Sequence, residues 1–189
     1  MSRTALFVID IQYALALNPS TAIPHASRII ESGTAVLKKA RDYIDSTRAR
    51  GETPDLDIVV VQHEETPDRG DLQRGTQAWE LAFPQRDGDD NERLVYKDVR
   101  DTFASNPHLA DELRARGVSR IVTFGIQSEC CVLSTSRGAL SEKFEVSLLS
   151  GAHSTYDAEG KAAELIEREV EDALRKEGAK IVEWQAWEP

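Results

Sequence analysis

The sequence predicts an α/β protein in which helices cover both faces of a mainly parallel sheet. Apolar runs of strand length alternate with longer segments whose apolar residues recur at helical spacing. The first run, residues 5–12, is apolar on both faces, which is typical of a central strand in a parallel sheet. The 189 residues hold no internal repeat and no low-complexity segment. We therefore expect one domain over residues 1–189, built as a three-layer α/β/α sandwich.

The composition restricts the function classes. The formal net charge of -10 argues against nucleic acid or an anionic membrane as a partner. No apolar run approaches the roughly 20 residues that span a bilayer, and no apolar signal segment precedes the first strand. Two adjacent cysteines do not make a disulfide framework. We expect a cytoplasmic protein whose partner is a small molecule.

In the first half of the chain, the strand over 5–12 leads into a proline-containing loop at 19–24. A helix over about 26–44 follows, and a polar connector at 51–57 leads to a second strand over 57–64. The helix is expected to pack on the sheet, because its apolar residues share one stripe: Ala26, Ile29, Ile30, Gly33, Val36, Leu37, Ala40 and Ile44.

The middle of the chain contains a long connection. Residues 64–93 are rich in charge, glycine and proline, and loops of this length in compact domains are often functional. A brief strand over 94–99 follows it. The next helix is expected to start at Asn106 and Pro107, with asparagine as the cap and proline at the first helical position, and to end at Gly117.

The second half of the chain continues the alternation. A strand over 120–124 leads to a helix from about Cys131. A strand over 144–149 is followed by a long helix over about 158–177, and a last short strand covers 179–184.

Three polar residues stand at the carboxyl ends of predicted strands: Asp10, Lys97 and Cys131. In a parallel sheet these ends share one edge, where the ligands of open α/β sheets bind. Cys131 follows Gly125, which permits a tight turn, and the first turn of a helix lowers the pKa of a thiol. Asp10 could then take the thiol proton, and the positive charge of Lys97 could keep the carboxylate ionised and stabilise the thiolate. Backbone N–H groups between Gln127 and Cys131 could bind an oxyanion.

Each candidate also has a plainer interpretation. Asp10 could cap the following loop, and Lys97 could be a solvated surface lysine. Cys130 is interpreted as a small packing residue, because neighbouring cysteines rarely pair. His63 ends the second strand, and we favour a hydrogen-bonding residue under a loop over a direct catalytic part, although it could line the site. Trp79 could form a wall for the substrate or a lid packed on the core.

Four segments in the same order resemble the isochorismatase-like cysteine hydrolases over nearly the whole chain: residues 7–12, 95–103, 125–132 and 150–155. The first is similar to the family's first strand, with its aspartate and the following glutamine, here Gln12. Counting from Gly125 places the family's cysteine on Cys131, because Val132 comes next. The resemblance implies a Rossmann-like, isochorismatase-type hydrolase fold.

The resemblance also implies a reaction. Cys131 would attack the carbonyl of a small-molecule amide, ammonia or an amine would leave, and water would hydrolyse the thioester. Asp10 would act as the base and Lys97 as the stabilising cation. A non-proline cis peptide is implied between Ile126 and Gln127. It would aim the N–H of Gln127, together with that of Cys131, at the oxyanion.

The resemblance further implies substrate contacts from Gln12, His63 and Trp79. Nicotinamidases in this family hold a metal through an Asp-x-His pair and a distant histidine. Here Val61 takes the place of that aspartate, so the chain is closer to the metal-free amidohydrolase branch. We therefore expect no metal and no cofactor.

Two other functions stay open on the same fold. The chain could be an isochorismatase-type hydrolase of a vinyl ether, or a binding protein without catalysis. The presence of Cys131 favours the amidase over the first, and the presence of all three candidate positions argues against the second. Family members are commonly homo-oligomers, and we expect a dimer or tetramer. Trp184 and Trp187 could serve that interface or could cover the monomer's own edge.

Overall fold

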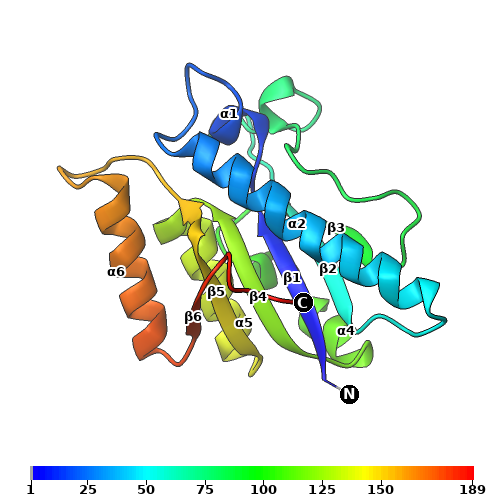
Figure 1. The fold of residues 1–189 in the computed structure, drawn as a ribbon. Helices are drawn as coiled ribbons and strands as arrows, with labels where there is room; N and C mark the ends of the chain where they lie inside the picture. The colour runs from blue at the N-terminus through cyan, green and yellow to red at the C-terminus, as the bar shows by residue number, and fades with distance from the viewer. Residues whose placement is uncertain (1) are drawn as a thin grey trace.

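Six strands of residues 2–189, the part of the chain that this computed structural model describes, form one sheet (Figure 1). Their order is β3-β2-β1-β4-β5-β6, and each neighbouring pair runs parallel. The strands are β1 (Arg3–Ile9), β2 (Leu56–His63), β3 (Glu92–Lys97), β4 (Val118–Ile126), β5 (Glu145–Ser154) and β6 (Lys180–Glu183). The predicted α/β fold with a parallel sheet is confirmed.

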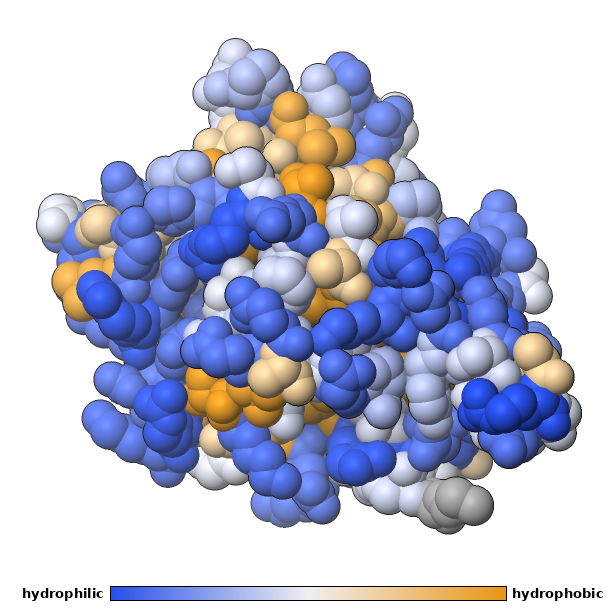
Figure 2. All heavy atoms as spheres, viewed as in Figure 1, coloured by the Kyte–Doolittle hydropathy of each residue, from blue (hydrophilic) through white to orange (hydrophobic). Residues whose placement is uncertain are grey.

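Helices cover both faces of the sheet. The long helix α2 (Ala26–Ala49) crosses one face, and α4 (Leu109–Ala115), α5 (Leu133–Ser141) and α6 (Ala163–Lys176) lie on the other (Figure 1). Two short helices, α1 (Tyr13–Ala16) and α3 (Thr102–Ser105), and the 3-10 turn η1 (Gln77–Trp79) lie in the connections. No helix within residues 2–189 has both the length and the apolar character to cross a membrane. Figure 2 shows that polar side chains dominate the viewed face, with apolar side chains in small groups.

The alternation of side chains along β1 explains why two separate cores form. Ala5, Phe7 and Ile9 are buried with α4, α5 and α6, whereas Leu6 and Val8 are buried with α2. Successive residues of a strand point to opposite faces, so a strand in the middle of three layers must be apolar on both. This accounts for the continuous apolar run at 5–12.

The strand order fixes where a ligand site can form. Chain connections lead outward from β1 towards β3 on one side and from β4 towards β6 on the other. A crevice opens at such a switch point, beyond the carboxyl ends of the two central strands. Asp10 directly follows β1 and Gln127 directly follows β4, so the fold places both at this crevice.

Gly125 is required by the close approach of β4 to β1, rather than by the tight turn that we expected from the sequence. Strand β4 continues past it to Ile126, and the φ angle of Gly125 is +135°. A Cβ atom at this position would lie 2.1 Å from the carbonyl oxygen of Ile9. Only glycine lets the two strand ends approach this closely, directly beside Asp10.

One other expectation from the sequence is corrected, and one open alternative is decided. The helix expected at Asn106 and Pro107 begins at Leu109, because the Asn106 side chain donates hydrogen bonds to the Tyr96 and Thr102 carbonyls instead of capping it. Trp187 is 7% exposed and packs in the core on the α2 face, so it covers the edge of its own monomer.

A buried ionic cluster ties the starts of β1 and β2 to the end of α4. Asp57, 4% exposed, accepts two hydrogen bonds from Arg3 and two from Arg116, at 2.7–2.9 Å. Burial alone would raise the pKa of Asp57, but the two guanidinium groups hold it below its ordinary value. The carboxylate therefore contributes to the free energy of unfolding as long as it stays charged.

We expect Asp57→Asn to lower the free energy of unfolding by about 3 kcal/mol near neutral pH, because it leaves two arginines around an uncharged buried group. A lowered pKa contributes stability above the unfolded value near 3.9, so the loss should shrink as pH falls below about 4. Urea unfolding measures both effects. Asp42→Asn, which breaks the exposed pair with Lys38, is the control and should cost under about 0.5 kcal/mol.

Candidate active site

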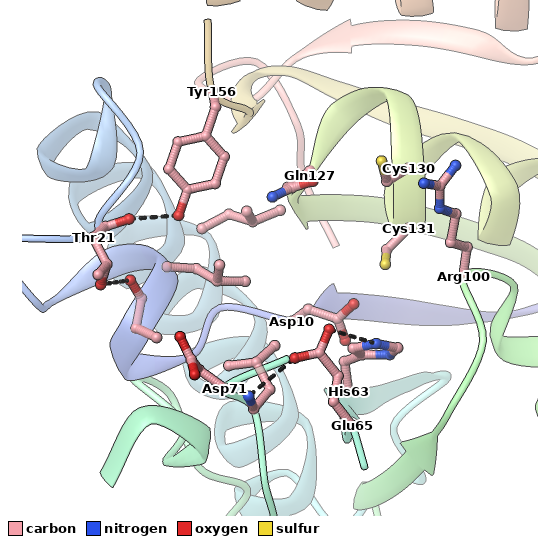
Figure 3. A pocket seen from close by; sticks show the side chains of 14 residues that line it. Asp10, Thr21, His63, Glu65, Asp71, Arg100, Gln127, Cys130, Cys131 and Tyr156 are labelled. Carbon is pink, nitrogen blue, oxygen red and sulfur yellow. Dashed lines mark hydrogen bonds and ion pairs between the residues drawn. The ribbon is translucent and has the colours of Figure 1, made fainter. Parts of the chain in front are cut away.

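A cavity of about 370 Å³ opens at the carboxyl ends of β1 and β4 (Figure 3). The strand ends and the turn after β4 form its floor, and the loops after β1, β2, β3 and β5 form its walls. Its lining residues are Asp10, Ala14, Leu15, Thr21, His63, Glu65, Asp71, Leu72, Arg100, Ile126, Gln127, Cys130, Cys131 and Tyr156. A small molecule fits such a cavity.

The floor of the cavity brings Asp10, Lys97 and Cys131 together from three strand ends. The Lys97 Nζ atom lies 2.7 Å from Asp10 Oδ2 and 3.1 Å from Cys131 Sγ. All three residues are at least nine-tenths buried. Lys97 is therefore not the solvated surface lysine of the plainer interpretation, and Asp10 does not cap a loop.

Asp10 presents a free oxygen to the cavity. Its φ angle is +49°, a left-handed conformation that aspartate tolerates better than most residues, and this turns the chain directly after β1. Oδ2 of its carboxylate pairs with Lys97, and Oδ1 has no hydrogen-bond partner within residues 2–189. A buried carboxylate oxygen without a partner can accept a proton from a neighbouring group.

The expected low pKa of the Cys131 thiol is wrong. Burial raises its pKa well above the ordinary value, and the negative charge of Asp10 raises it further, while Lys97 acts in the opposite direction. The prediction considered the helix start alone. We therefore expect the thiol to be neutral before a substrate binds.

Lys97 keeps its charge in this buried place. Burial opposes an ammonium ion, but the negative charge of Asp10 favours it, and the pKa of Lys97 is raised above its ordinary value. The site thus contains a permanent positive charge 3.1 Å from the sulfur. A thiolate formed during a reaction would be stabilised by that charge.

Cys131 lies in a π-helical turn, η2 (Ser128–Val132), and not in the first turn of a regular helix as expected. The Val132 N–H donates to the Gln127 carbonyl at 3.1 Å, and α5 begins only at Leu133. Such wide turns are frequent at functional sites. The peptide bond between Ile126 and Gln127 is cis, as the resemblance implied. The Gln127 N–H donates to no backbone carbonyl of residues 2–189.

A buried polar chain fixes this turn to the rest of the fold. Ser128 Oγ lies 2.8 Å from His153 Nδ1, and His153 Nε2 lies 3.3 Å from Glu171 Oε1. Ser128 and His153 are both fully buried. These hydrogen bonds connect η2 to β5 and α6, so they position the turn that carries Cys131.

His63 lines the cavity and contacts the central lysine. Its Nδ1 atom lies 3.1 Å from Lys97 Nζ, which donates, and burial followed by the Lys97 charge lowers the pKa of His63. One ligand atom each of Asp10, His63 and Cys131 lies within 4.8 Å of the others, a set that suits a metal ion. Lys97 Nζ contacts all three, so an ammonium already occupies the place of the cation.

Gln12 and Trp79 are not among the residues that line the cavity, and their contact with the substrate stays a prediction. Gln12 is fully buried and binds the backbone of His63 and Trp79, with three hydrogen bonds of 2.9–3.0 Å. Trp79 stacks on Tyr96 with a centroid distance of 5.8 Å, and the Arg74 guanidinium lies over both rings. Both side chains therefore shape the loops behind the cavity wall.

Several lining residues had no signal in the sequence beyond their place in loops: Thr21, Glu65, Asp71, Arg100 and Tyr156. Three of them come from loops that the sequence already marked by length or by proline. Cys130 packs against the core, as expected, and its half-buried side chain also lines the cavity.

Comparisons with known proteins show which proteins this chain is similar to. The model of the isochorismatase domain matches residues 4–185. A streptothricin hydrolase from Streptomyces noursei is 37% identical over 153 residues, which are 81% of this chain and 55% of that protein. This chain thus spans about half the length of that relative.

Solved structures share the fold. An isochorismatase hydrolase structure from Oleispira antarctica superimposes with a TM-score of 0.80 and 20% identity, covering 97% of this chain and 95% of that one. N-carbamoylsarcosine amidase from Thermoplasma acidophilum superimposes with a TM-score of 0.72 and 20% identity, covering 99% of each chain.

Proposed function

Because the chain belongs to the isochorismatase-domain family, we propose that it is a cysteine hydrolase of a small-molecule amide. The observation that carries the proposal is that Asp10 and Cys131 line one cavity and that the buried Lys97 ammonium contacts both. A base with a free oxygen, a fixed cation and a thiol are the groups that acyl transfer to sulfur needs.

In the first half of the reaction, Asp10 takes the Cys131 proton as the sulfur attacks the amide carbonyl. The carbonyl oxygen becomes an oxyanion, which the backbone N–H groups of Gln127 and Cys131 bind. The C–N bond then breaks, the Asp10 proton passes to the leaving nitrogen, and a thioester remains on Cys131. The positive charge of Lys97 stabilises the sulfur as it becomes negative.

In the second half, Asp10 removes a proton from water, and the hydroxide attacks the thioester carbonyl. The C–S bond breaks, the acid leaves, and the sulfur recovers the proton from Asp10. No metal or cofactor takes part in these steps, since the Lys97 ammonium is the cation beside the sulfur. The cytoplasmic location and the homo-oligomeric state expected from the sequence stay predictions.

Streptothricin is the first substrate to test, because a streptothricin hydrolase is 37% identical to this chain. We expect the protein to hydrolyse streptothricin or members of a panel of small amides, with primary amides giving an acid and ammonia and cyclic amides giving a ring-opened amino acid. Intact mass spectrometry should detect an acyl adduct on Cys131 in rapidly quenched samples. Hydrolysis of isochorismate with no amide turned over would contradict the proposal and favour the vinyl-ether reaction instead.

A further inference from the structure

The loop after β2 presents two carboxylates to the cavity, those of Glu65 and Asp71, and neither has a firm cationic partner (Figure 3). Within residues 2–189, no lysine or arginine nitrogen lies within 4.0 Å of either group. The nearest basic atom to Glu65 is Nε2 of His63, at 3.9 Å. Burial and Lys97 lower the pKa of His63, so this imidazole is neutral near pH 7.

The neighbouring Glu64 shows what the same loop does with an acid outside the cavity. Its Oε2 atom accepts hydrogen bonds of 2.9 and 2.6 Å from Arg74, so its charge is neutralised. Glu64 does not line the cavity. On this loop Asp68 is also unpaired among the described residues but lies outside the cavity, whereas Glu65 and the exposed Asp71 are unpaired carboxylates that line it.

Glu65 is held in place by the protein. Its Oε2 atom accepts the Leu72 N–H at 3.0 Å, and the side chain is 25% exposed. The carboxylate lies against Gly70, where a Cβ atom would approach Oε2 to 2.0 Å. A negative charge that is fixed, partly buried and not neutralised attracts a cation from the ligand.

Two further groups indicate that a ligand completes this site. Asp10 lines the cavity and is 1% exposed, and its Oδ1 atom has no hydrogen-bond partner within residues 2–189. Arg100 lies on the Cys131 side of the cavity, across from Asp71 (Figure 3). Opposite charges at the two sides would orient a charged substrate, with a cation drawn towards Asp71 and repelled by Arg100.

We propose that the substrate carries a cationic group, an ammonium or a guanidinium, which Glu65 and Asp71 bind while the amide lies over Cys131. This inference rests on the proposed amide hydrolysis for the role of the site. The charge preference of the cavity is nevertheless measurable without turnover, at the thiol itself.

The first test compares methanethiosulfonates with an ethylammonium, a neutral ethyl or an ethylsulfonate group as modifiers of Cys131, in a Cys130→Ala background. We expect the cationic reagent to react roughly tenfold faster than the neutral one and the anionic reagent slowest. Asp71→Asn and Glu65→Gln should each lower the ratio of cationic to neutral rates by roughly three- to tenfold. Asp68→Asn removes the same charge from an exposed position of the same loop and should leave the ratio unchanged.

Equal rates for cationic and neutral reagents would overturn the inference. So would a ratio that Asp71→Asn and Glu65→Gln leave unchanged, or one that Asp68→Asn lowers equally. Thermal melting of each variant shows whether the fold is intact, and the two wall variants serve as independent checks of each other.

The second test compares three amides of equal length: 6-aminohexanamide, neutral heptanamide and the monoamide of pimelic acid. We expect kcat/KM to be highest for the ammonium compound, with the preference lost in Asp71→Asn. Turnover of heptanamide at an equal or higher rate would overturn the cationic substrate and leave amide hydrolysis standing. If the thiol assay shows a cationic preference but neither streptothricin nor any other amide is hydrolysed, the proposed amide hydrolysis is overturned and the cation preference of the cavity stands.

Discussion

Replacing Cys131 with alanine is expected to lower kcat for the amide substrate by roughly 10⁴-fold or more, because the variant has no atom that can form the thioester. Cys131 Sγ is the sulfur that lies 3.1 Å from the Lys97 ammonium. The acyl adduct seen by intact mass spectrometry should disappear with it. Ammonia or amine release, measured against a heat-denatured blank, gives the rate.

Cys130→Ala is the matched control, since it makes the same change at the adjacent residue. Cys130 is half-buried, and the sulfur that Lys97 contacts is that of Cys131. Its side chain lines the cavity, so we expect a loss of kcat below about tenfold rather than none. Equal damage in both variants, or normal turnover by Cys131→Ala with an unchanged melting temperature, would exclude Cys131 as the nucleophile.

The floor of the site was predictable from the sequence because it depends on strands. Apolar runs of strand length place Asp10 and Lys97 at strand ends and Cys131 in the turn after β4, and a parallel sheet brings those ends to one edge. The position of the cysteine came from residue spacing after Gly125. These features depend on local pattern and on sheet geometry, which a sequence records directly.

The walls were not predictable, because they depend on contacts between loops. Glu65 faces the cavity since the Leu72 N–H and the space at Gly70 hold it there, and no periodicity announces either contact. Gln12 directly follows an apolar strand, yet its amide turns inward to the backbone of His63 and Trp79. Polar residues near a site can support it or contact the ligand, and the difference is one of side-chain direction.

The protonation of Cys131 was predicted with the wrong sign for a related reason. A helix start lowers the pKa of a thiol by a known mechanism, and the sequence shows the helix start. Burial and the nearby carboxylate act in the opposite direction and are stronger here, but they exist only once β1, β3 and η2 are packed together. The corrected protonation leads to a prediction that separates the roles of Asp10 and Lys97.

Replacing Asp10 with asparagine should lower kcat by roughly 10³-fold or more and at the same time speed up the alkylation of Cys131 by iodoacetamide. The carboxylate is the base of the reaction, so its loss stops turnover. Its charge also raises the pKa of the resting thiol, so its loss lowers that pKa and increases the thiolate fraction at about pH 8. One pKa unit corresponds to about tenfold in thiolate, and we expect an acceleration of that order.

Lys97→Met should slow the alkylation of Cys131, whereas Asp10→Asn speeds it up. Both variants should lower kcat. The ammonium lowers the pKa of the thiol, so its removal leaves a buried sulfur beside an unpaired carboxylate and slows the reagent. Turnover falls as well, because the sulfur loses its stabilising charge. Melting temperatures of both variants, in a Cys130→Ala background, separate these effects from unfolding.

The pH dependence in the wild type decides between two ways of activating the nucleophile. If the thiol is neutral at rest, alkylation of Cys131 should keep rising with pH beyond about 8.5, the ordinary value for cysteine, without a plateau. A plateau near pH 7, together with slower alkylation in Asp10→Asn, would mean a preformed thiolate and would remove the need for Asp10 as the base. Continued rise, with a profile shifted to lower pH in Asp10→Asn, means that the proton leaves the sulfur only when a substrate is bound. In that case the free oxygen of Asp10 makes Cys131 reactive by accepting its proton. Burial keeps the thiol protonated before a substrate binds, so the thiol reacts only with molecules that fill the cavity.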